Sequence, residues 1–180
     1  NFTPSNVTDD EFKLILNGAS YDLMFDSSDS LYHTEQETFS RIQNLSNASN
    51  TYNAYWLITL KDGTKLRFGF NSDSELASNV GYSYALKWSL DQIQDTHSNK
   101  IFYSYAENPY QLDNGSVYLS KITYNNEQKR RIEFVYESAN RSDRRRVYEQ
   151  GNVLEESRRL SDISVLFNDT LVRRYNFEYL

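Results

Sequence analysis

Residues 82–105 place the strongest constraint on the fold, because large side chains alternate with smaller ones on both sides of a single polar break. The alternating residues are Tyr82, Tyr84, Leu86, Trp88 and Leu90 before the break, and Ile101, Tyr103 and Tyr105 after it. A period of two places these side chains on one face of a β-strand. The break, residues 95–99, supplies Asp, Ser and Asn, whose short side chains bond to nearby backbone and favour turns. The stretch therefore predicts a long hairpin.

Two further hairpins are predicted from residue pairs that tolerate tight turns. Asn17-Gly18 suits a type I′ turn between strands at residues 11–16 and 19–25, and Asp62-Gly63 suits the turn between residues 55–60 and 65–70. Other strands are expected at residues 39–45, 117–124, 131–136, 145–150, 153–156, 160–167 and 171–179, and a short helix only at residues 74–79. The chain also holds 10 Phe, 15 Tyr and 2 Trp, residues that favour strands. These features predict an all-β fold, an antiparallel meander of about ten to twelve strands that forms a winding sheet or a sandwich.

Length and charge narrow the classes of protein. We expect an exposed N-terminal arm at residues 1–10 and a single β-rich domain at residues 11–180, with an alternative boundary near residues 71–81. The net charge of −6 argues against general affinity for nucleic acid. No apolar run approaches the ~20 residues of a membrane span. The absence of cysteine excludes disulfides and thiolate metal sites.

Seven Asn-X-Ser/Thr triplets predict N-linked glycosylation of an exported protein. With 18 Asn and 32 Ser or Thr in 180 residues, chance gives about three such triplets. The predicted acceptors are Asn1, Asn6, Asn44, Asn47, Asn114, Asn140 and Asn168. The alternative is that Asn and Ser enrich loops whether or not they carry sugar.

Candidate catalytic and metal-binding residues form no signature. His33 and His97 lie in turn-like stretches and outside any metal-binding spacing, so we expect solvated loop positions. The segment from Asp26 to Ser30 contains Asp29 but lacks the Gly and the terminal Glu of a calcium loop. We therefore predict no catalytic residue, no cofactor and no metal.

Paired acids, a basic run and the tyrosine stripes each admit two interpretations. The pairs Glu35/Glu37 and Glu155/Glu156 are expected on solvated strand faces, although a glycosidase also needs two carboxylates. The run at residues 141–146 contains four Arg and one Asp, which favours local salt bridges over a polyanion site. Tyrosines at period two favour a core face over a carbohydrate-stacking platform.

Several segments together resemble the shell of Rhs/YD-repeat proteins, above all the N-terminal shell region of Tc-toxin B subunits. The segments are residues 56–69, 88–105, 118–124, 134–137, 159–163 and 172–179, among them the motifs Trp88-Ser-Leu-Asp91 and Asn99-Lys-Ile-Phe-Tyr103-Ser-Tyr105. The resemblance covers residues 11–180 and implies a piece of a β-sheet wall that encloses a toxic C-terminal domain. Ser98 stands where that family has Gly, so the turn there is expected to differ. The family's autoproteolytic and toxic regions have no match in this sequence, and their activities are not carried over.

These observations favour a non-enzymatic, exported structural β-protein, located outside the cell or on its surface. In this hypothesis the protein is a wall or fibre subunit that pairs with copies of itself or with flanking shell segments through its sheet edges, and it carries N-linked glycans. One alternative is an excised shell segment of a Rhs/Tc-type toxin. Another is an extracellular module that binds a carbohydrate or a receptor.

Overall fold

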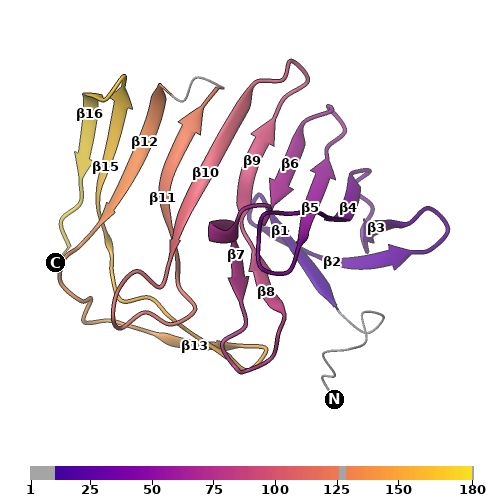
Figure 1. The fold of residues 1–180 in the computed structure, drawn as a ribbon, viewed down its shortest axis with the longest axis horizontal. Coiled ribbons are helices and arrows are strands. Elements are labelled where there is room, and N and C mark those ends of the chain that lie inside the picture. The colour runs from indigo at the N-terminus through magenta and orange to yellow at the C-terminus, as the bar shows by residue number, and fades with distance from the viewer. Residues whose placement is uncertain (1–10, 126–128, 180) are drawn as a thin grey trace.

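The computed structural model describes residues 11–125 and 129–179. The expected arm at residues 1–10, the acceptors Asn1 and Asn6, and residues 126–128 of one expected turn lie outside the described residues. Within the described chain, one large antiparallel sheet of twelve strands dominates and is not closed into a barrel (Figure 1). The prediction of an all-β antiparallel meander is confirmed, with a winding sheet rather than a sandwich. No helix in the described ranges has the length and apolarity needed to cross a membrane.

The strands of the large sheet are neighbours in space in the same order as in sequence. They are β1 (Phe12–Leu16), β2 (Ala19–Asp26), β3 (Leu31–Thr34), β4 (Arg41–Ser46), β5 (Ala54–Thr59), β6 (Lys65–Phe68), β9 (Leu90–Gln94), β10 (Lys100–Glu107), β11 (Val117–Tyr124), β12 (Arg130–Tyr136), β15 (Leu160–Phe167) and β16 (Thr170–Asn176). Two hairpins leave this order: β7 (Glu75–Ala77) with β8 (Ala85–Trp88), and β13 (Arg146–Glu149) with β14 (Asn152–Glu155). A short 3₁₀ helix, η1 (Ser72–Ser74), precedes β7.

The long hairpin expected at residues 82–105 is shorter than predicted. β10 pairs with β9 across residues 95–99, but β8 turns away at Ser89 and pairs with β7. Alternation indicates which side chains share a face of a strand, but it does not indicate which strand is the pairing partner. The sequence pattern therefore did not separate β8 from β9, although they belong to different sheets. In this turn Ser98 adopts a left-handed φ of 66°, a conformation that glycine takes more readily than other residues.

The helix expected at residues 74–79 is wrong. Only η1 is helical, and Glu75 and Leu76 belong to β7, where they pair with Trp88 and Lys87 of β8. Both side chains are buried, and the cross-strand pairing outweighs the weak local helix preference. β3 was not predicted from the sequence. It is four residues long and its ladder to β4 has the single pair Tyr32↔Ile42.

One face of the large sheet is apolar along almost its whole width. Aligned residues on this face are Ile42, Ile58, Leu66, Ile93 and Ile101 from β4 to β10, and Tyr103, Ile122, Ile132, Val165 and Arg173 from β10 to β16. A row on the other face mixes polar and apolar residues: Gln43, Leu57, Arg67, Gln92, Phe102, Thr123, Arg131 and Leu166. This difference between faces defines an inner and an outer side of the sheet.

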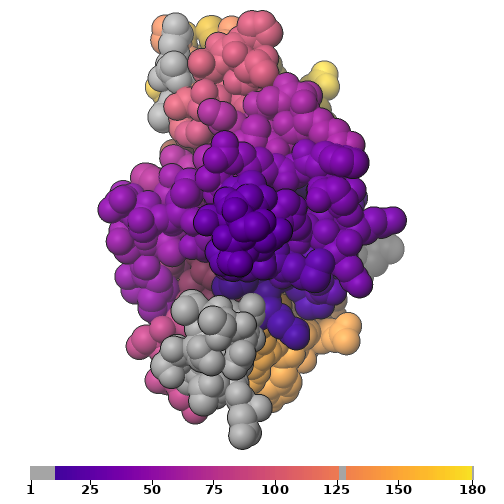
Figure 2. Space-filling view, turned by 90° about the vertical axis from the view of Figure 1, so that its right-hand side faces the viewer, coloured from indigo at the N-terminus to yellow at the C-terminus, as the bar shows by residue number. Residues whose placement is uncertain are grey.

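The core lies at the N-terminal half of the inner face. Ile42, Trp56, Ile58 and Leu66 are buried there, and residues from β1, β2, β3, β6, β8 and β9 pack against them. The ring of Trp56 lies 5.0 Å from that of Phe12 and contacts two more aromatic rings. Figure 2 shows the N-terminal strands covering most of this end of the molecule. The aligned inner-face residues of β10, β11, β12 and β15 are half-buried.

Candidate functional site

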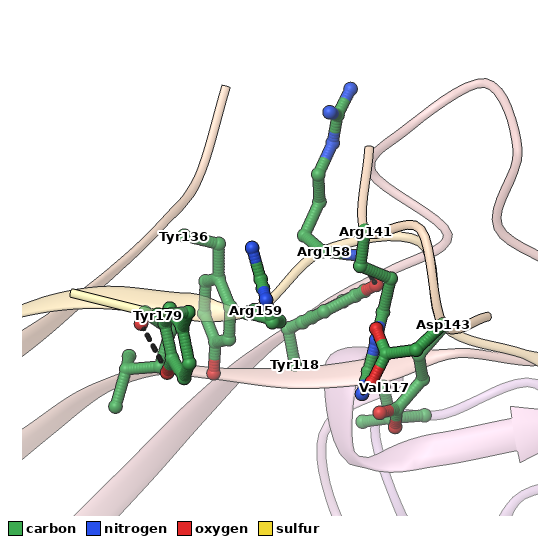
Figure 3. A pocket seen from close by; sticks show the side chains of 10 residues that line it. Val117, Tyr118, Tyr136, Arg141, Asp143, Arg158, Arg159 and Tyr179 are labelled. Atoms are coloured by element: carbon green, nitrogen blue, oxygen red, sulfur yellow. Dashed lines mark hydrogen bonds and ion pairs between the residues drawn. The ribbon is translucent and has the colours of Figure 1, made fainter. Parts of the chain in front are cut away.

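A polar cavity of about 570 Å³ lies where β11, β12 and the end of β14 meet the C-terminal segment (Figure 3). Its lining comes from positions far apart in the sequence: Val117, Tyr118, Tyr136, Arg141, Asp143, Glu156, Arg158, Arg159, Leu160 and Tyr179. The strands place Tyr118 and Tyr136 side by side, with ring centroids 4.6 Å apart in an edge-to-face contact. The cavity therefore has an aromatic floor and charged walls.

Three hydrogen bonds at the Tyr118 hydroxyl hold this side chain in place in the floor of the cavity. The hydroxyl donates to Asp113 Oδ1 at 2.9 Å and accepts the backbone N–H groups of Ser157 and Arg158 at 2.9 and 3.2 Å. Tyr118 is buried, and burial raises the pKa of its hydroxyl. Burial also raises the pKa of Tyr136 to about 12. Both phenols are neutral at physiological pH and act as fixed hydrogen-bonding groups.

The walls are held by ion pairs. Arg141 Nε lies 2.9 Å from Asp143 Oδ1, and Arg159 Nε lies 2.8 Å from Glu137 Oε2. The hydrogen bond from Arg141 lowers the pKa of Asp143 to about 2. The guanidinium of Arg159 also covers the ring of Tyr179 at 4.3 Å, a cation–π contact. The guanidinium of Arg158 instead points away from these rings and covers Tyr110 (Figure 3).

A second cavity of about 320 Å³ adjoins the first. Both are lined by Val117, Arg141, Asp143 and Glu156, so we call the two together the hairpin groove. The second cavity lies between the hairpins β7–β8 and β13–β14 and adds the apolar residues Leu76, Leu86, Val147 and Leu154.

Asn152 joins the two hairpins. Its side chain is fully buried, its Oδ1 accepts bonds from Ser78 Oγ and Asn79 N at 2.9 and 2.7 Å, and its Nδ2 donates to Tyr84. These bonds tie β14 to the loop between β7 and β8. The groove is thus built from two hairpins joined by hydrogen bonds, and its lining presents aromatic, polar and apolar side chains.

Of the residues singled out from the sequence, Glu156 lines the groove, and Glu35 and Glu37 are exposed but lie outside any strand. The expectation that Glu155 lies on a solvated strand face is wrong, because ion pairs shield its side chain, which is 12% exposed. The basic run is bridged as expected, since Arg144 and Arg146 contact Glu155 at 3.3 and 3.0 Å. Glu156 is exposed at the groove, and His97 is exposed in its turn. Sequence reasoning did not find the groove, because its lining joins strands whose contact depends on tertiary structure. The Arg141-x-Asp143 spacing was its only local signal.

One group of described residues, Asp26, Asp29 and His33, brings three potential metal-ligand atoms within 4.8 Å of one another. His33 Nε2 lies 3.1 Å from Asp29 Oδ2, and its Nδ1 lies 3.4 Å from Glu37 Oε2. The hydrogen bond to Asp29 raises the pKa of His33. A protonated imidazole between carboxylates accounts for this arrangement. The expectation of a solvated loop position for His33 is wrong, because His33 belongs to β3, pairs with Met24 of β2 and has a half-buried side chain.

The five described glycan acceptors all lie on the surface. Asn44 is in β4, and Asn47, Asn114, Asn140 and Asn168 are in turns or connections. Asn114 Oδ1 accepts a bond from Asn79 at 2.7 Å, so this side chain is partly engaged. Their glycosylation stays a prediction.

The fold and the groove together define an all-β domain with an open, winding antiparallel sheet and a groove between two inserted hairpins. A family model described as Salmonella virulence plasmid 65kDa B protein matches residues 30–155, and the chain belongs to this family. No curated protein sequence matches the chain.

Solved structures with the same fold include Tc complexes and an effector protein. The Tc holotoxin pore of Photorhabdus luminescens has a TM-score of 0.69 at 16% identity over 95% of this chain, and the TcdB2-TccC3-Cdc42 complex has 0.68 at 17% identity over 97%. The N-terminal domain of the effector protein SpvB from Salmonella typhimurium strain LT2 has a TM-score of 0.64 at 16% identity over 88% of this chain. The chain spans 11% of each Tc chain and 70% of the SpvB chain. The resemblance to a Tc-type shell region is confirmed at the level of fold.

Proposed function

We propose that the chain is a wall segment in the protein shell of a secreted toxin of the Rhs/Tc type. The observation that carries this proposal is the open twelve-stranded sheet, which keeps its strands in sequence order and has one continuous apolar face. A sheet of this kind can be extended strand by strand without a change of topology. Membership of the family and the fold shared with Tc structures support the same function.

The partner that we propose is a neighbouring shell segment that pairs with β16. This strand is at the edge of the sheet, and all seven of its residues are exposed. Leu171, Val172 and Tyr175 are 47%, 65% and 47% exposed. An edge strand with unpaired backbone groups and apolar side chains is a template for a further strand.

Two finer proposals rest on the same surfaces. A second copy of the chain could occupy the β16 edge, which would make the protein a self-associating wall or fibre subunit. Glycans on the exposed acceptor asparagines would then shield the surfaces around the edge, and they would require export from the cell. An intact-mass measurement of the natural protein tests the glycans directly.

The hairpin groove favours a second candidate function, the binding of a carbohydrate or receptor segment. Its floor of Tyr118 and Tyr136 and the ring of Tyr179 supply apolar surface beside fixed hydrogen-bonding groups. A glycan array supports this function if sugars bind and if Tyr179→Ala abolishes the binding. An array without hits removes the carbohydrate form of this candidate.

Hydrogen exchange at β16 tests the wall function. We expect the outward-facing amides of β16 to exchange fast in the isolated chain and to be protected in the complete natural protein, while β9 and β10 are equally protected in both. Protection that instead rises with the concentration of the isolated chain would identify a second copy as the partner. Fast exchange at β16 in the complete protein would refute the proposed pairing.

A further inference from the structure

The junction between β10 and the β7–β8 hairpin contains acidic side chains that the proposed wall function does not use. β10 pairs with β9 only from Lys100 to Phe102. Beyond this point η1 takes the place of β9, and Asp73 Oδ2 accepts the backbone N–H of Tyr105 at 2.9 Å. Tyr105 in turn donates its hydroxyl to the backbone oxygen of Leu90 at 2.6 Å. The Asp73 carboxylate thus accepts a backbone N–H of β10 at a position where β9 no longer supplies an acceptor.

Two more carboxyl groups lie at this junction, and each has an oxygen without a partner. Glu75 of β7 is 3% exposed, and its Oε1 accepts the backbone N–H of Thr51 at 3.0 Å. Its Oε2 is buried and has no hydrogen-bond partner among the described residues. The same holds for Oε1 of Glu107, at the end of β10. Buried acceptors without donors are rare and costly, and an ionised carboxylate is the most costly of them.

The charges around Glu107 increase this cost. Asp73 of η1 and Glu75 of β7 are the charged groups that act on it, and both are acids. Arg67 forms an ion pair with Asp91 at 2.7 Å, so this cation is already matched by its own carboxylate. Tyr52 and Tyr105 complete the titratable groups, and burial raises the pKa of both phenols. The junction therefore holds three carboxyl groups and no cation of its own among the described residues.

Protonation lowers the cost of burying the two orphan oxygens. A neutral carboxylic acid gains an O–H donor and loses the charge that its two neighbours repel. Burial, with the charges of Asp73 and Glu75, raises the pKa of Glu107 to about 7. Burial also raises the pKa of Glu75, against the opposing effect of the backbone N–H groups of Thr51 and Tyr52.

We propose that this junction is a proton-controlled latch, which holds the β7–β8 hairpin closed against β10 in mildly acidic solution and loosens it as the pH rises. The latch would act on the hairpin groove, because Leu76, Leu86 and Lys87 of β7 and β8 form one wall of its second cavity. When the junction is protonated, the hairpin stays in place and the groove keeps the width seen in the structure. When the junction loses its protons, the hairpin loosens and the groove widens. Trp88 would respond as well, since it pairs with Glu75 across the hairpin and its buried Nε1–H has no acceptor among the described residues.

The direction and the size of the pH effect on latch closure follow from the linkage between proton binding and closure. The ordinary pKa of a glutamate is 4.5, and the closed latch raises that of Glu107, so closure is favoured by acid and weakens as the pH rises from 4.5 toward about 7. For a fully shielded group, closure at pH 6 would be about tenfold more favourable than at pH 8. Glu107 is only half-buried, and screening by solvent reduces the expected factor to about threefold.

Hydrogen exchange with mass spectrometry on the full chain tests the latch. After correction for the intrinsic pH dependence of exchange, we expect peptides covering residues 71–88 and 103–107 to be about threefold more protected at pH 6 than at pH 8. In Glu107→Gln the protection at pH 8 should approach that of the natural chain at pH 6, and the pH dependence that remains, which Glu75 supplies, should be smaller than in the natural chain. The matched control is Glu156→Gln, an exposed carboxyl at the groove, which should keep the natural response.

Two results would overturn the proposal: equal protection of the natural chain at both pH values, or the same pH response in Glu107→Gln as in the natural chain. A carboxyl NMR titration of the natural chain gives an independent reading if the variant fails to fold. A midpoint for Glu107 near 7 supports the latch, and a midpoint near the ordinary value of 4.5 overturns it.

Discussion

Replacement of Asp91 by alanine is expected to destabilise the protein more than any exposed acidic substitution. The Asp91 side chain is completely buried and lies 2.7 Å from Arg67 Nε through Oδ1. Its Oδ2 accepts the backbone N–H groups of Phe70 and Asn71 at 2.7 and 3.1 Å, and the hydroxyl of Ser74 at 3.2 Å. One carboxylate thus holds together β6, β9 and the start of η1.

These contacts determine how much Asp91→Ala lowers the free energy of unfolding. Removal of one partner of a buried ion pair costs about 3–5 kcal/mol, and each buried donor left without an acceptor adds about 1–3 kcal/mol. Because water can enter the space left by the side chain and the Arg67 side chain is 20% exposed, we expect a loss of about 4 kcal/mol in the free energy of unfolding. This is a large share of the ~5–15 kcal/mol typical of whole domains.

Urea unfolding followed by tryptophan fluorescence is the assay. With a slope of about 2 kcal/mol per molar urea, Asp91→Ala should lower the midpoint by about 2 M. The control Asp62→Ala, in an exposed turn, should shift it little. In an Arg67→Met background the cost of Asp91→Ala should fall, because no unpaired cation remains. A loss below about 1 kcal/mol, or an equal loss in both backgrounds, would refute the assigned role of Asp91.

Three further predictions concern a glycine, the core and a histidine. Gly69→Ala should cost about 3 kcal/mol in thermal unfolding, because φ is +72° and the new Cβ would clash with the Trp88 ring; a loss under about 1 kcal/mol would contradict this packing. Ile58→Ala should cost about 2–5 kcal/mol, whereas an apolar-to-alanine change on exposed β16 should be nearly neutral, and equal losses would contradict the assigned core. The pKa of His33, read by NMR, should lie above 6.5 and fall in Asp29→Asn. Its ion pairs are complete below pH 6.5 and are lost as the pH rises through the raised pKa, so an unchanged pKa in the variant would refute the pairing.

Local sequence patterns predicted the strands well where a turn residue limited the alternatives. The pairs Asn17-Gly18 and Asp62-Gly63 mark hairpins that the structure contains at these positions. The pattern failed at Ser89, where the chain passes from one sheet to another without a break in alternation. Alternation depends on the chain's own geometry, whereas the choice of partner depends on side chains such as Asp91 that act across more than 20 residues.

The groove and the acidic junction could not be predicted for a related reason. Tyr118 meets Arg158 across 40 residues of sequence, and Glu107 meets Glu75 only because η1 replaces β9 beside β10. No local motif encodes such contacts. The bridging within the basic run was predictable, because Arg141 and Asp143 are two residues apart.

The strand order also has a consequence for how the sheet is made. Every strand of the large sheet pairs with the preceding one, or with the last one before an inserted hairpin, so no pairing waits for a distant part of the chain. Most of these steps close a short loop, so the loop-closure entropy paid at each of them is small. The sheet can therefore grow in one direction, as a zipper closes, while the polypeptide is still emerging from a ribosome or a secretion channel. In such growth the most recently added strand is always the edge, and only the arrival of the next strand covers it.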